Sequence, residues 1–145
     1  MITRLEDLRI WQMAREINND VFQIISTEKI RRDWPLRDQL NRSAASIMDN
    51  IAEGFGRNGK REFIQFLSIS KASCVETKSQ LFRAVDRIYI DKSQFDFTFD
   101  KVDHLEKMLA KMMNHVRKLE GKGWKFDSRG REDENTLGRE HEGTR

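Results

Sequence analysis

Apolar side chains recur at steps of three and four residues in four stretches of the chain, a spacing that places them on one face of an α-helix. The first stretch predicts a helix over residues 4–26, with Thr3 as its N-cap. Its apolar seam consists of Ile10, Ala14, Ile17, Val21 and Ile24.

A second helix is expected over residues 34–52. Asp33 precedes it as an N-cap, and Pro35 lies in its first turn, where the missing N–H of proline costs nothing. Three glycines within residues 54–59 predict the end of this helix and a tight connection to the next one. The seam consists of Leu36, Leu40, Ala44, Ile47 and Ile51.

A third helix is expected over residues 60–90 and a fourth over residues 98–119, with a loop over residues 91–97 between them. No stretch alternates apolar and polar residues as a strand does. The pattern predicts an all-α fold, an antiparallel up-and-down four-helix bundle. The two seams are Phe63, Leu67, Ser70, Cys74, Thr77, Leu81 and Ile88, then Val102, Leu105, Leu109, Met112, Val116 and Leu119.

The domain boundary is expected after residue 120. Residues 1–120 form the bundle domain, and residues 121–145 form a polar tail that we expect to be disordered, because it can bury too little apolar surface. The sequence leaves open whether Trp124 and Phe126 fold back onto the bundle.

Composition narrows the class of protein further. The chain has 145 residues, one Cys and one Pro, which excludes a disulfide framework and a cysteine-based zinc site. No apolar run approaches the roughly 18 residues of a membrane span, and the N-terminus lacks the pattern of a signal peptide. We therefore expect a cytoplasmic protein that makes no membrane contact.

Arrangements of residues typical of catalysis are missing from the sequence. His104 and His115 are eleven residues apart, about 16 Å along a helix, which is too far to share a metal. No Glu-x-x-His pair, phosphate-binding glycine loop or nucleophile elbow occurs, and no Arg precedes a His by the four to six residues used in some helical-bundle RNases. We expect a non-enzymatic protein with no cofactor and no metal.

Polar side chains line one side of the second and third helices beside the apolar seams. Antiparallel packing brings Arg42 opposite Glu76, which predicts a partly buried ion pair. A structural network that fixes the register of the two helices is favoured over a ligand site. Its expected members are Gln39, Arg42, Ser46, Asn50, Glu53, Ser73, Glu76 and Gln80.

Apolar residues outside the seams indicate a surface for self-association, the commonest use of such faces. A thicker core that absorbs some of them is the alternative. The candidate interface consists of Trp11, Phe22, Ile64, Val75, Phe82 and Tyr89.

The net charge of +3 comes from residues 34–90, which contain nine Lys and Arg against six Asp and Glu. Arg57, Lys60 and Arg61 crowd the glycine-rich connection and could reach phosphates without reading a base sequence. Arg37, Lys71 and Lys78 add to this candidate nucleic-acid-binding set. Ordinary solubilising charge is the alternative interpretation.

Three segments carry a family resemblance. Residues 8–14, residues 62–81 and above all residues 36–54, which end in the letters NIAEG, resemble the four-helix proteins encoded by intervening sequences in bacterial 23S ribosomal RNA genes. Lys71 departs from the small residue that many members have, and the tail lies outside the resemblance. The motif residues of the family coincide with the polar network, which supports a structural role for that network.

The resemblance implies a bundle that assembles as a ring-shaped homopentamer. The family includes the accessory variability determinants of diversity-generating retroelements, which bind nucleic acid and a reverse transcriptase, whereas most other members have no established activity. The expected function is therefore a homo-oligomeric, RNA-binding or RNA/DNA-binding accessory protein. The alternative is a protein-interaction module that serves as an accessory subunit of a reverse transcriptase.

Overall fold

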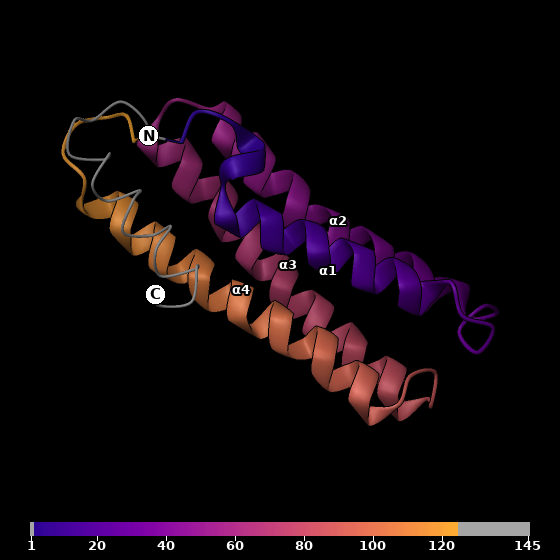
Figure 1. The fold of residues 1–145 in the computed structure, drawn as a ribbon. Helices are drawn as coiled ribbons and strands as arrows, with labels where there is room; N and C mark the ends of the chain where they lie inside the picture. The colour runs from indigo at the N-terminus through magenta and orange to yellow at the C-terminus, as the bar shows by residue number, and fades with distance from the viewer. Residues whose placement is uncertain (1, 125–145) are drawn as a thin grey trace.

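Four long helices pack side by side in the computed structural model of the chain, which describes residues 2–124 (Figure 1). A short 3-10 turn, η1 (Leu5–Asp7), precedes them. Among the described residues there is no β-strand, only an isolated bridge between Gly59 and Gly123. The all-α class and the four predicted helices are therefore confirmed. The helices are α1 (Arg9–Ile25), α2 (Trp34–Gly56), α3 (Lys60–Asp86) and α4 (Lys92–Lys118).

The first two helices differ from their predicted bounds. The 3-10 turn and the extended backbone of Leu8 delay the start of α1 to Arg9, so Thr3 does not cap it. At α2 the predicted cap is confirmed, because Asp33 Oδ1 accepts a hydrogen bond from the backbone N–H of Leu36 at 3.2 Å. This helix continues to Gly56, and its last turns include two of the glycines that were expected to end it.

The predicted loop over residues 91–97 is wrong, because α4 already begins at Lys92. The Asp91 side chain accepts a hydrogen bond from the N–H of Gln94 at 2.8 Å, and the Gln94 side chain accepts one from the N–H of Asp91 at 3.3 Å. This reciprocal capping box satisfies two backbone donors that would otherwise lack partners.

The end of α3 is a Schellman turn with an unusual residue at its centre. The N–H of Ile88 bonds the carbonyl of Val85 at 3.0 Å, and the N–H of Tyr89 bonds the carbonyl of Ala84 at 2.9 Å. This geometry needs a left-handed backbone at Ile88, where φ is 61°. A β-branched residue pays a steric penalty in that conformation.

Replacement of Ile88 by Gly is expected to stabilise the fold by about 1 kcal/mol, because glycine adopts a positive φ without the steric penalty. Ile88 is 73% exposed, so little buried contact is lost. Urea unfolding would show a higher midpoint with an unchanged slope. Ile88→Ala is the control: it shortens the side chain but keeps the strain, and an equal gain there would refute the backbone explanation.

The core lies between all four helices and takes in every predicted seam residue except Ile88. Cys74 is one of the buried residues, and burial raises the pKa of its thiol to about 12.

Past α4, the chain turns back across one end of the bundle. Trp124 is 2% exposed and stacks on Phe63, with ring centroids 4.0 Å apart, and meets Phe55 edge-on at 5.9 Å. Trp124 therefore folds back onto the bundle. Phe126 and the rest of the predicted tail lie outside the described residues. Trp124, four residues past the expected boundary, belongs to the core of the bundle.

Candidate nucleic-acid interface

A buried network of small hydroxyl side chains joins α2 to α3. Ser43 Oγ donates to Gln80 Oε1 at 2.6 Å and accepts from Thr77 Oγ1 at 2.8 Å. Ser70 Oγ donates to the carbonyl of Ile47 at 2.8 Å. Small side chains let the two helices approach closely, and each buried hydroxyl has a partner, as a stable interior requires. Ser43, Ser70 and Thr77 were not among the expected members.

Several predicted members do belong to this network. The hydroxyls of Ser46 and Ser73 lie 2.8 Å apart across the helix pair. Asn50 Nδ2 donates to Ser46 Oγ at 3.0 Å, and Gln80 bonds Ser43 as described above.

The predicted ion pair between Arg42 and Glu76 is wrong. Arg42 Nε lies 3.0 Å from Asp38 Oδ2, one helical turn away, and both side chains are exposed. Glu76 is exposed on α3. Glu53 pairs with Arg57 at 2.9 Å, and Gln39 accepts a hydrogen bond from Arg83. The charged members of the predicted set therefore lie at the surface, where an ion pair contributes little.

Lys78, predicted to bind nucleic acid, forms ion pairs with two acidic residues of α4. Its Nζ lies 2.5 Å from Asp103 Oδ1 and 2.7 Å from Glu106 Oε1, and also lies over the Phe99 ring. Burial alone would lower the pKa of Lys78, but the hydrogen bonds to the two carboxylates raise it. Two negative partners leave no net positive charge for a phosphate.

The other predicted cations do not gather in one place. Arg57 pairs with Glu53 and lies over the Phe66 ring. Arg37 lies at the opposite end of α2, where it packs over Trp34 and donates to the carbonyl of Arg31 at 3.1 Å. Lys71 lies half-buried in the middle of α3.

Lys60 has a structural role between α3 and α4. Its backbone N–H donates to the carbonyl of Lys122 at 2.7 Å, and its Nζ donates to the carbonyls of Arg117, at 3.3 Å, and of Leu119. These contacts neutralise the negative end of the α4 dipole, a place usually taken by the helix's own last cations.

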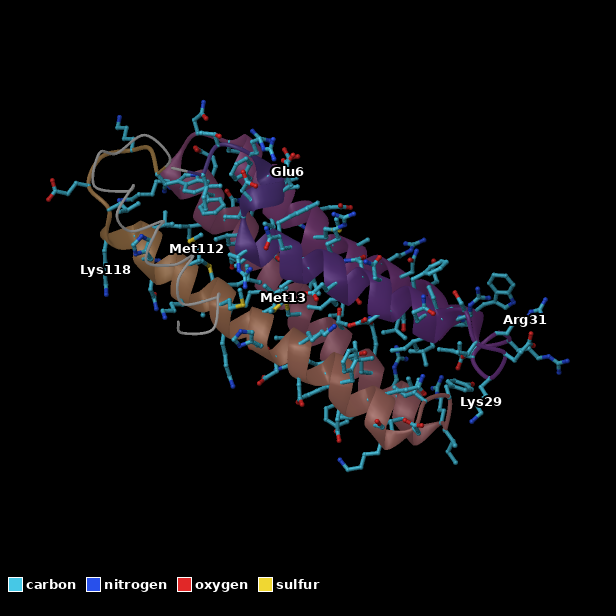
Figure 2. The ribbon with its side chains drawn as sticks, in the orientation of Figure 1. Glu6, Met13, Lys29, Arg31, Met112 and Lys118 are labelled. Atoms are coloured by element: carbon cyan, nitrogen blue, oxygen red, sulfur yellow. The ribbon has the colours of Figure 1, made fainter. Side chains whose placement is uncertain are left out.

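Three cations at the end of α4 and just after it are exposed to solvent. We call Arg117, Lys118 and Lys122 the basic corner. All three are exposed; within the described residues the Arg117 side chain donates a hydrogen bond to the neutral Asn114, and neither Lys118 nor Lys122 has an acidic partner. Figure 2 shows Lys118 at one end of the bundle and Lys29 at the other.

A sequence signal for the basic corner exists. Residues 107–119, which are the second half of α4 and its C-cap, contain four Lys and Arg and one His but no Asp or Glu. On a helix, Lys107, Lys111 and Lys118 share one line that faces solvent. The acidic residues between Asp91 and Glu106 offset these cations. A net charge summed over the whole helix therefore hides the asymmetry.

The six residues of the predicted apolar interface fall into two groups, one packed against the core and one exposed. Trp11, Ile64 and Tyr89 are half-buried and pack against the core, as the thicker-core alternative expects. The Tyr89 hydroxyl also donates to Asp33 Oδ2 at 2.9 Å. Burial acts to raise the pKa of Asp33, but hydrogen bonds from Tyr89, the Leu36 N–H and Arg87 lower it overall.

The remaining three stay exposed, Phe22 at 63%, Val75 at 51% and Phe82 at 50%. Phe82 joins an aromatic cluster with Phe95 and Phe99, at ring distances of 5.0 and 5.3 Å. Further exposed apolar residues, Trp34, Ile88 and Phe97, lie at the end of the bundle opposite the basic corner.

No described helix is long and apolar enough to cross a membrane. Within residues 2–124, no three His, Cys, Asp or Glu side chains are grouped so that they could hold a metal ion.

Known proteins support the fold described above. A family model described as 23S rRNA-intervening sequence protein matches residues 6–111. A similar solved structure is that of a protein of unknown function from the S23 ribosomal protein family of Bacteroides thetaiotaomicron, with a TM-score of 0.66 and 20% identity over 72% of this chain and 97% of that one. At this identity the likeness shows the fold alone. No curated protein matches the chain.

Proposed function

Because the chain belongs to the 23S rRNA-intervening sequence protein family, we propose that it is a non-enzymatic, homo-oligomeric protein that binds the phosphate backbone of nucleic acid. The basic corner supports this proposal most directly. Three exposed cations without an acidic partner among residues 2–124 lie at the end of α4 and just after it, where Lys60 bonds the carbonyls of Arg117, Leu119 and Lys122.

The chemistry of the corner favours phosphate over bases. Aromatic rings near it, Phe55, Phe63 and Trp124, are buried in the core and cannot stack on a nucleotide. Lys and Arg that contact phosphates give affinity that depends on salt and carries no sequence information. Assembly of several copies would multiply this modest charge, which is how a chain of net charge +3 could hold a polyanion.

The test is the triple substitution of Arg117, Lys118 and Lys122 by Gln, with binding to an RNA hairpin measured at several salt concentrations. We expect at least a tenfold weaker affinity, with a slope of log K against log salt that is shallower by about 2 to 3, since each lost phosphate contact removes 0.7–0.9. Permuting the hairpin sequence is expected to change little.

A matched control removes the same charge from the other end of the bundle. Lys29, Arg31 and Arg32 are exposed in the loop before α2, and their replacement by Gln is expected to weaken binding less than threefold. Equal losses in both triples would show that diffuse charge, and not the corner, attracts the RNA. A wild-type protein that binds no RNA would refute the proposal and favour the protein-interaction alternative, in which the apolar end containing Phe22 and Trp34 docks a partner.

A further inference from the structure

The connection between α2 and α3 contains an Asn-Gly pair, Asn58 followed by Gly59. Helix α2 ends at Gly56 and α3 begins at Lys60, so Asn58 lies in neither helix, and its side chain is exposed to solvent. Asn58 therefore differs in backbone conformation from the other asparagines among residues 2–124. Those all lie within helices: Asn18, Asn19, Asn41, Asn50 and Asn114.

An asparagine followed by glycine can lose its amide without any enzyme. The backbone nitrogen of the glycine attacks the side-chain carbonyl carbon Cγ, so that the N–Cγ bond forms and the Cγ–Nδ2 bond breaks. The amide proton of the glycine leaves with Nδ2 as ammonia, and a succinimide ring remains. Water then opens the ring at either carbonyl and yields aspartate or isoaspartate, so the sum of the steps consumes one water and releases one ammonia.

Both reacting groups are available at this position. Neither the side-chain amide of Asn58 nor the backbone N–H of Gly59 has a hydrogen bond to another residue within the described part of the chain. Gly59 also has no Cβ that would hinder the approach of its nitrogen to Cγ. A Cβ there would stand 1.5 Å from Oε2 of Glu62 and would have to displace this carboxylate. The pair thus combines an unbonded amide with an unhindered nitrogen.

The asparagines in the helices are protected by hydrogen bonds. In an α-helix the N–H of the following residue is bonded to a carbonyl one turn earlier, which fixes the nitrogen and engages its proton. Asn18 Nδ2 also donates to the carbonyls of Ala14 at 2.9 Å and Ala44 at 2.8 Å. Asn50 Nδ2 donates to the carbonyl of Ser46 at 2.8 Å. These residues serve as references within the same chain.

A carboxylate at position 58 would lie beside the basic corner. The carbonyl oxygen of Asn58 is 3.6 Å from the place of a Cβ on Gly123, directly after Lys122. The N–H of Lys60 bonds the carbonyl of Lys122 at 2.7 Å. Isoaspartate would also add one CH2 group to the backbone next to the bridge between Gly59 and Gly123. Both products therefore change the place where the chain returns to the bundle.

The positive charge around Asn58 extends into α3. Arg61, predicted to bind nucleic acid, is exposed on the first turn of that helix and forms no ion pair within residues 2–124. A new carboxylate three residues earlier in the chain would therefore reduce the net charge that this end of the bundle offers to a phosphate.

We propose that Asn58 is a site of spontaneous deamidation, and that the added carboxylate weakens the binding of phosphates at the basic corner. The modification itself depends only on the connection that contains Asn58 and Gly59. Its effect on nucleic acid rests on the proposed function, and the two parts are therefore tested by separate measurements.

The modification is tested on the full chain, aged at mildly alkaline pH and then digested after glutamate. Mass spectrometry of peptide 54–62, which contains Asn58, is expected to show a gain of about 1 Da. Peptide 29–53, which contains Asn41 and Asn50, is the internal reference. Deamidation there is expected to be at least about tenfold slower, because a misplaced nucleophile costs that much or more. A methyltransferase specific for isoaspartate is expected to label the aged peptide 54–62.

Two variants check the route through the succinimide. Asn58→Gln lengthens the side chain, so that ring closure would need a larger ring, and peptide 54–62 of this variant should keep its mass. Gly59→Ala places a Cβ beside the attacking nitrogen and should slow the gain. Equal rates in peptides 54–62 and 29–53, an equal mass gain in Asn58→Gln, or a product without isoaspartate would overturn the proposal.

The affinity for an RNA hairpin tests the consequence for binding. Asn58→Asp, which fixes the charge of the product, is expected to weaken binding about threefold at low salt and less at high salt, since salt screens the added charge. Asn41→Asp makes the same change at an exposed position in the middle of α2 and should alter the affinity less. Circular dichroism confirms that both variants remain folded.

Equal effects of Asn58→Asp and Asn41→Asp would overturn the consequence for binding. A wild-type chain that binds no RNA would refute the proposed function together with that consequence. The mass gain in peptide 54–62 would still establish the modification, so the failure of one proposal is distinguished from the failure of the other.

Discussion

Truncation of Trp124 to Ala is expected to destabilise the fold by about 3–5 kcal/mol, the usual cost of emptying a large aromatic site in a core. The residue is 2% exposed and stacks on Phe63 at 4.0 Å, so the substitution opens a cavity at one end of the bundle. For a chain of this size the melting temperature should fall by about 10 °C or more. Thermal unfolding followed by circular dichroism measures the change.

Trp34 provides a control of the same residue type. It is 70% exposed on the first turn of α2, and Trp34→Ala is expected to change stability by less than about 0.5 kcal/mol. If the two substitutions had equal effects, Trp124 would not be part of the core. The same comparison shows whether the packed unit extends past residue 120.

The second large effect is expected at Gly54, in the last turns of α2. A Cβ atom at this position would lie 2.9 Å from the Cβ of Phe66 and 3.1 Å from a ring carbon of Phe63. The first of these atoms is fixed close to the backbone of α3, so the helices must separate. Gly54→Ala is therefore expected to destabilise the protein by about 1–3 kcal/mol, as overpacking does, even though Ala favours a helix.

Substitution of Gly56, two residues later in the same helix, is a control that separates the effect of packing from the effect of helix propensity. No atom lies within 4 Å of a Cβ placed there, so Gly56→Ala should be neutral or slightly stabilising. Urea denaturation of the two variants measures the difference, and effects of the same sign would contradict the packing argument. Opposite signs for one substitution at neighbouring glycines would show that Gly54 is needed for the close approach of α2 and α3.

The core of this fold could be predicted from the sequence because its residues obey one periodicity. All five predicted seam residues of α1, and all five of α2, are buried. The predicted loop over residues 91–97 overlooks the start of α4, where Asp91 and Gln94 have the spacing of a capping box. That error was avoidable with local rules alone.

The candidate site was harder to predict because its side chains depend on partners in other helices. Lys78 looks like an available cation until α4 brings Asp103 and Glu106 against it. Arg42 could reach α3 from its predicted position, but Asp38, one turn away, competes at lower entropic cost. Single-helix periodicity determines which face a residue occupies, and it contains no information on which neighbour that face will meet.

The single cysteine, Cys74, makes local opening of this bundle measurable by thiol labelling. With the pKa of Cys74 raised to about 12 by burial, the folded protein contains very little of the reactive thiolate at neutral pH. A thiol reagent thus modifies the chain almost entirely through conformations in which α3 has swung away from the core and the thiol regains its ordinary acidity. The labelling rate then reports how often Cys74 becomes accessible, and no cysteine has to be introduced for the measurement.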